Sequence, residues 1–147
     1  MKTKKLFYYL VFIFFFMNIN NYRNAQAQND SSSSQIIAML NTFYEKYIAM
    51  IAKEPPKLYA DKMDSILKKR CTKNLLRFIK YFKYDYDPII KAQDADIECL
   101  KTLTIKKEIN ESNKYIVSYF DNYTKTEITI NLIIVKEKES YKIDSIW

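Results

Sequence analysis

The sequence predicts an α+β domain in which N-terminal helices pack on one curved, four-stranded antiparallel sheet. Apolar residues recur at intervals of three and four up to residue 82, which is the period of an amphipathic helix. From Leu100 onward the interval becomes two, the period of a strand with one buried face. Short polar segments separate these later apolar runs, so we expect neighbouring strands to be joined as hairpins. Helices followed by a run of strands are typical of the α+β class.

Residues 1–27 have the three parts of a secretory signal peptide. Lysines precede an unbroken apolar run from Leu6 to Met17, and small residues close the segment at Ala25-Gln26-Ala27. We expect cleavage between Ala27 and Gln28 and a periplasmic or secreted protein, which meets the membrane only during export. A retained anchor is the less favoured alternative, because the run is shorter than the roughly 18 to 20 residues that cross a bilayer.

The polar residues 28–34 are expected to form a flexible lead-in to a single domain over residues 35–147. Ser33 or Ser34 can cap a first helix of about five turns, which a proline pair ends. The core face of this helix is expected to consist of Ile36, Ile37, Leu40, Phe43, Tyr44, Tyr47, Ile48 and Ile51.

Two more helical pieces are expected between Leu58 and Phe82, and Thr72 can cap the second of them. Pro88 then forces Asp87 out of helical geometry, so Asp87 can cap the short helical turn that follows.

Four strands complete the predicted domain. They are expected around Leu103 to Ile109 and over residues 115–120, 127–136 and 141–147. Because the chain has no glycine, asparagine and aspartate are expected at any turn position with positive φ. The third strand is apolar on both faces over Leu132 to Val135, which favours a partner on its outer face, such as a second copy of the chain.

The absence of two residue types excludes many functions. Without glycine, the chain cannot form the usual phosphate-binding loops, dinucleotide fingerprints or nucleophile elbows. Without histidine, it lacks the commonest general base and the commonest zinc ligand. A hydrolase that uses two carboxyl groups is still compatible with this composition.

The net charge of +7 is weak evidence for a nucleic-acid partner. Lys2, Lys4, Lys5 and Arg23 belong to the predicted leader, which contains no acid, and the remaining charges are nearly balanced. Basic runs such as Lys68-Lys69-Arg70 are typical of solvated surfaces. We therefore expect no nucleic-acid partner.

Two alternatives are open for Cys71 and Cys99. In an oxidising compartment a lone pair of cysteines often forms a disulfide. Closing this loop of roughly 28 residues would stabilise the fold by about 3 to 4 kcal/mol on the chain-entropy model. The other alternative is two buried thiols that pack as small apolar side chains.

The densest polar cluster of the sequence lies between the helices and the strands and consists of Asp85, Asp87, Gln93, Asp94 and Asp96. These side chains suit the oxygen ligands of a calcium ion, the rim of a ligand pocket, or caps that satisfy local backbone N–H groups. The sequence favours the caps most. The predicted ligand-binding residues are Asp85, Asp87, Gln93 and Asp94, with Tyr44 and Tyr47 on the facing helix. No catalytic residue, metal or cofactor is assigned.

Four segments together carry a resemblance to a known family. They are Phe43 to Tyr47, Asp85-Tyr86-Asp87-Pro88, Ala92-Gln93-Asp94 and the C-terminal Tyr141 to Trp147. The chain resembles small secreted bacterial proteins catalogued as a domain of unknown function, with a fold similar to nuclear transport factor 2 and the cystatin-like group. The resemblance implies a cone-shaped sheet around the long helix and an exported location, but no agreed activity.

We therefore expect a non-catalytic, exported binding protein that holds a small ligand or a peptide in the open end of the cone. The main alternative is an immunity-type protein that neutralises a toxin in the periplasm, which predicts a filled cone and a charged, aromatic outer surface. A carboxylate-based enzyme is a further alternative. It requires two carboxyl groups roughly 5 to 9 Å apart that face a cavity.

Overall fold

The computed structural model describes residues 31–53, 56–81 and 85–147. The leader expected over residues 1–27 and the start of the lead-in lie outside these residues. The chain divides into two compact units, Met1–Gln35 and Ile36–Trp147. The second unit holds the sheet and every residue of the described core.

Within residues 31–53, 56–81 and 85–147 the helical part consists of one long helix and three shorter ones. The first helix covers residues 31–53 and is followed by α2 (Pro56–Arg70), α3 (Lys73–Tyr81) and the single turn α4 (Cys99–Thr102). Residues 31–34 are therefore helical, where the sequence predicts a flexible lead-in. Serine costs only a few tenths of a kcal/mol more than alanine in a helix, so a helix can extend through a serine run.

The strands form one antiparallel sheet in sequence order, which confirms the predicted α+β class and the four-stranded meander. Strand β1 covers Thr104–Lys107, β2 covers Lys114–Asp121, β3 covers Thr126–Glu137 and β4 covers Ser140–Ile146. The prediction that Ile109 belongs to the first strand is wrong. Pairing of β1 with β2 ends at Lys107, opposite Tyr115, so Ile109 lies in the hairpin turn and is 94% exposed.

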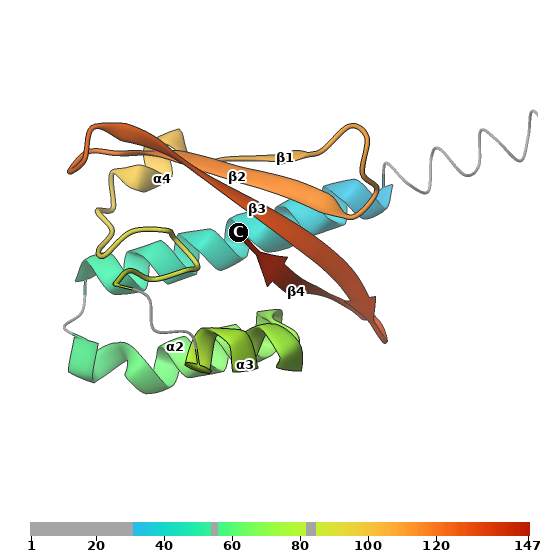
Figure 1. The fold of residues 1–147 in the computed structure, drawn as a ribbon, viewed down its shortest axis with the longest axis horizontal. Coiled ribbons are helices and arrows are strands. Elements are labelled where there is room, and N and C mark those ends of the chain that lie inside the picture. The colour runs from blue at the N-terminus through green and yellow to red at the C-terminus, as the bar shows by residue number, and fades with distance from the viewer. Residues whose placement is uncertain (1–30, 54–55, 82–84) are drawn as a thin grey trace, which may run out of the picture. The chain divides into compact units, whose positions relative to one another are not determined.

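The core lies between the first helix and the inner face of the sheet. In Figure 1 this helix, from residue 36 on, has β1, β2 and β3 on one side and α2 and α3 on the other. The helix contributes seven buried core residues: Ile36, Met39, Leu40, Phe43, Tyr44, Tyr47 and Ile48. The sheet contributes alternate residues of its strands, as the period of two predicts, with Tyr115, Val117, Tyr119, Ile130, Leu132, Ile134 and Ile143 all buried.

Thr72 joins the helices to the last strand. Its Oγ1 accepts the N–H of Leu75 at 3.2 Å, which confirms the predicted cap of α3. The same hydroxyl donates to Asp144 Oδ1 at 2.8 Å, and the Thr72 N–H donates to the Ile143 carbonyl at 2.9 Å. One side chain therefore fixes both the start of α3 and the position of that helix against β4.

The two cysteines are buried free thiols in this structure, without a disulfide between them. Cys71 lies beside Ile143 of β4, whereas Cys99 opens α4. Burial raises the pKa of the Cys71 thiol to about 12 and also raises that of Cys99, so both thiols are protonated and poor nucleophiles at neutral pH.

Lysines occupy the positive-φ positions of the described residues, and the expectation of asparagine or aspartate there is wrong. Lys91, Lys125 and Lys138 have φ angles of 52°, 58° and 54°. The short loops and the strand register impose these angles on whichever residue stands there. A non-glycine residue in this conformation costs about 1 to 2 kcal/mol, and the rest of the fold has to offset that cost.

We predict that Lys138→Gly stabilises the protein. Lys138 stands in the two-residue turn between β3 and β4, and glycine relieves about 1 to 2 kcal/mol of backbone strain there. The greater freedom of glycine in the unfolded chain offsets part of this, which leaves a gain of about 0.5 to 1 kcal/mol. Urea unfolding measures the gain. Lys136 lies inside β3, so the control Lys136→Gly should lower stability. Equal effects of the two substitutions would show that the backbone at Lys138 is not strained.

Candidate functional site

A cleft of about 1020 Å³ opens where the first helix ends, beside the loop before α4 and the turn between β2 and β3. Three groups of residues line it. The first helix contributes Ala52 and Lys53, and the loop contributes Asp85, Tyr86 and residues 91–97. The end of β2, the turn after it and the start of β3 contribute Asp121, Asn122, Tyr123, Thr124, Thr126 and Ile128. The cleft has the size of a site for a small organic ligand.

The structure divides the predicted site residues into two sets. Asp85, Gln93 and Asp94 line the cleft, together with Asp96 from the same sequence cluster. Tyr44, Tyr47 and Asp87 are not among the lining residues. Whether any of them contacts a ligand stays a prediction, but the second set has an evident role inside the fold.

Three buried tyrosine hydroxyls hold the loop that forms one wall of the cleft. Tyr47 donates to Asp87 Oδ2 at 2.8 Å and Tyr44 donates to the Ile89 carbonyl at 3.2 Å, both from the first helix. Tyr119 of β2 donates to the Ile90 carbonyl. A buried tyrosine needs an acceptor for its hydroxyl, and residues 87–90 supply all three acceptors. Tyr119 is not among the predicted site residues, although the period of two in β2 places it on the inner face of the sheet.

Asp87 caps the turn, as the sequence predicts. Its Oδ1 accepts the N–H of Ile89 at 2.8 Å, while Oδ2 accepts the hydroxyl of Tyr47. Burial raises the pKa of this carboxyl above its ordinary value, and the hydrogen bonds from Tyr47 and from the backbone of the turn oppose that rise. Both oxygens are therefore used in holding the loop.

Four aspartates and two lysines give the cleft an excess of negative charge: Asp85, Asp94, Asp96 and Asp121 against Lys53 and Lys91. The ammonium group of Lys91 donates to the Thr129 carbonyl at 3.2 Å. Asp94 Oδ1 accepts the N–H of Ala95 at 2.8 Å.

Asp121 holds the turn between β2 and β3, which lines the cleft together with the loop. Its carboxylate accepts the Thr124 hydroxyl at 2.6 Å and the Tyr123 N–H at 2.9 Å. The hydrogen bond from Thr124 is the main reason why the pKa of this carboxyl lies below its ordinary value. Asp121 is therefore a fixed negative charge at the cleft at neutral pH.

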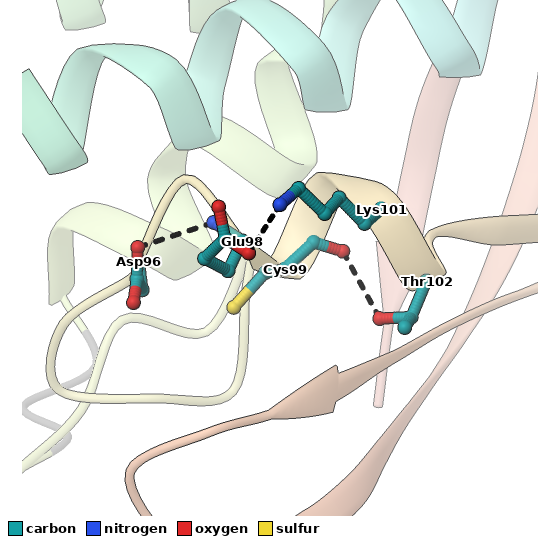
Figure 2. A network of polar contacts seen from close by, with 5 residues as sticks. All are labelled: Asp96, Glu98, Cys99, Lys101 and Thr102. Carbon is teal, nitrogen blue, oxygen red and sulfur yellow. Dashed lines mark hydrogen bonds and ion pairs between the residues drawn. The ribbon is translucent and has the colours of Figure 1, made fainter.

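The short helix α4 fixes the end of the cleft-lining loop (Figure 2). Asp96 Oδ1 accepts the N–H of Glu98 at 3.1 Å, and the Glu98 carboxylate pairs with Lys101 at 2.6 Å. Thr102 Oγ1 accepts the N–H of Phe120 in β2 at 2.9 Å. The loop is thus attached to the sheet at its end as well as through the tyrosines.

The described residues contain no group of three or more histidine, cysteine or acidic side chains placed to hold a metal ion. Among the described residues, therefore, no set of metal-ligating side chains supports calcium binding by the aspartate cluster. No helix among the residues with described structure is long and apolar enough to span a bilayer.

Comparison with known proteins identifies one similar fold and no activity. No family model and no curated protein matches the chain. The chain is similar to a crystal structure of a protein of unknown function from Bacteroides thetaiotaomicron, with 29% sequence identity and a TM-score of 0.76. The match covers 82% of this chain and 95% of that one. The fold is therefore shared with a bacterial protein of unknown function.

We predict that Tyr47→Phe destabilises the protein by about 1 to 3 kcal/mol, because it removes a hydrogen bond from the partly buried Asp87 carboxyl. Chemical denaturation measures the loss. The control Tyr141→Phe removes a hydroxyl from a half-buried tyrosine of β4 and should change stability by less than about 0.5 kcal/mol. A loss no larger for Tyr47→Phe than for the control would show that this bond does not hold the loop.

We also predict a pH dependence due to Asp87. Between the ordinary pKa of 3.8 and its higher value in the folded protein, the unfolded chain has already lost the proton that the folded chain keeps. Stability due to this group therefore falls as the pH rises through that window. Relative to Asp87→Asn, the wild type should lose stability from about pH 4 upward. Unfolding both proteins at a series of pH values tests this, and a constant or opposite difference would contradict it.

Proposed function

We propose that the chain is an exported binding protein whose cleft holds a small cationic organic ligand, such as an amine. The observation that carries the proposal is the lining of the 1020 Å³ cleft, where aspartates outnumber lysines and Tyr86 and Tyr123 are exposed. Carboxylates attract an ammonium group, and the face of a tyrosine ring adds a cation–π contact. The two kinds of side chain together form a site that favours organic cations.

The walls of this cleft are held before any ligand arrives. The loop with Asp94 is held by the buried tyrosines, and the turn with Tyr123 is held by Asp121. A site that is already ordered loses little conformational entropy on binding, which favours affinity for a small molecule.

Binding is favoured over catalysis by the position of Asp87. Burial raises the pKa of its carboxyl group, which is the direction that suits a general acid. Yet it is not part of the cleft lining, and both of its oxygens are engaged by Tyr47 and Ile89. The carboxyl group of Asp87 is thus used for structure.

We also propose that the fold is of the nuclear transport factor 2 type. A long helix against a twisted antiparallel meander, with a cleft beyond its end, supports a fold of the nuclear transport factor 2 type. Export is supported by the signal-peptide pattern of residues 1–27. An immunity role, a peptide ligand and pairing of two copies through the sheet stay predictions.

The proposal is tested with the chain purified from the exported fraction of its host, where mass spectrometry should find Gln28 at the N-terminus. Calorimetric titration with spermidine, choline and an uncharged polyol as probes measures binding at the cleft. We expect a cation to bind and the polyol not to bind. The double variant Asp85→Asn/Asp94→Asn should weaken cation binding by about tenfold or more, since a charged hydrogen bond contributes about 1.5 to 3 kcal/mol.

The matched control is Glu139→Gln, which removes a charge from the exposed turn between β3 and β4, outside the cleft lining. It should leave the affinity within a factor of two. Equal weakening by the control, or failure of every cation to bind at millimolar concentration, would reject the proposed ligand class.

A further inference from the structure

A second, smaller pocket of about 190 Å³ lies between the first helix and α2. The first helix lines it with Thr42, Phe43 and Lys46, and α2 lines it with Ser65, Ile66, Lys69 and Arg70. Residues four apart on a helix share a face, so Thr42 with Lys46, Ser65 with Lys69, and Ile66 with Arg70 are each presented together. This pocket shares no lining residue with the larger cleft.

The charged side chains that line this pocket are all cationic. Lys46, Lys69 and Arg70 contribute positive charge, and none of the described lining residues is acidic. The neighbouring Lys68 is paired with Asp64 at 2.5 Å, whereas the three lining cations have no ion pair among the described residues. Like charges around one small pocket repel each other, and a bound anion would turn this repulsion into attraction.

Lys69 and Arg70 stand in the last turn of α2, where cations are common for a reason unrelated to ligand binding. Cations at a helix C-terminus stabilise the carbonyl groups that lack partners there. In this protein Lys142 of β4 also supplies a cation at this helix end, because its Nζ donates to the carbonyl of Lys68 in the last turn at 3.1 Å and to that of Cys71, just after the helix, at 3.4 Å. Lys69 and Arg70 line the pocket.

The size and donors of the pocket indicate the class of anion. A volume of 190 Å³ is well below that of a site for a drug-sized molecule, roughly 300 to 1000 Å³, so it fits a single small group. Arginine binds phosphate-like oxygens in bidentate fashion, and lysines add point charges. The hydroxyl of Thr42 already donates to the Ala38 carbonyl at 2.9 Å, so it can only accept. The donors for an anion are therefore the three cations and Ser65.

We infer that the pocket between the first helix and α2 is a binding site for a tetrahedral oxyanion, either free phosphate or the phosphate group of a small monoester. Arg70, which is half-buried, supplies the bidentate donor, and Lys46 supplies charge from the facing helix. Phe43 and Ile66 form the apolar floor. The site is independent of the proposed cleft ligand.

The test is a calorimetric titration of the full exported chain with inorganic phosphate, with the ionic strength held constant by chloride. We expect saturable binding and a melting temperature that rises with phosphate concentration, as for any ligand that binds only the folded state. Arg70→Gln and Lys46→Gln should each weaken binding about tenfold or more. Arg70→Lys, which keeps the charge and loses the bidentate donor, should fall between Arg70→Gln and the wild type.

The matched control is Lys68→Gln, which removes the same charge from the same helix outside the pocket. It should change the affinity less than twofold. Absence of saturable binding at about 20 mM phosphate, or equal weakening by Lys68→Gln and Lys46→Gln, would overturn the assignment. Lys46 is exposed, so Lys46→Gln is expected to fold. This variant therefore still tests the assignment if Arg70→Gln does not fold.

A parallel titration with glycerol phosphate distinguishes the two sources of the anion. Equal affinity for both probes supports free phosphate as the ligand, and tighter binding of glycerol phosphate supports a monoester. The double variant Asp85→Asn/Asp94→Asn should leave phosphate binding unchanged, because those residues line the other cleft.

Discussion

The hydroxyl groups of three core tyrosines require acceptors, and residues 87–90 provide them. Tyr44, Tyr47 and Tyr119 are almost completely buried between the first helix and the sheet, where an unsatisfied hydroxyl is costly. The loop has little regular structure of its own. These three hydrogen bonds, from two different layers of the fold, give it a defined position and so define one wall of the cleft.

The same constraint explains why the chemistry of Asp87 differs from that of its neighbours in sequence. Asp87 is directed into the core side of the loop, where burial raises its pKa and Tyr47 holds it. Asp85 and Asp94 stand on the other side and line the cleft. A cluster that looks uniform in the sequence is therefore divided by the loop into a structural part and a part available to a ligand.

Much of the fold could be predicted because it depends on local periodicity. The period of 3.6 identified the core face of the first helix, the period of two identified β2, β3 and β4, and a threonine in the right place identified the start of α3. The predictions that fail concern positions whose conformation is set by strand pairing and loop closure. Ile109 fits a strand pattern but falls beyond the last paired residue of β1, and three lysines take positive φ angles that no local preference predicts.

The sequence by itself determined the α+β class, the order of the elements and a polar cluster between helices and strands, because each follows from side-chain pattern along one segment. Only the tertiary structure decided which polar residues share a cleft, since that depends on residues far apart in the chain. Asp94 and Tyr123 come to one cleft through packing of the loop against the β2–β3 turn. Lys46 and Arg70 come to one pocket because the first helix packs on α2. Burial of the apolar faces brings these groups together, and no pattern within either segment specifies the pairing.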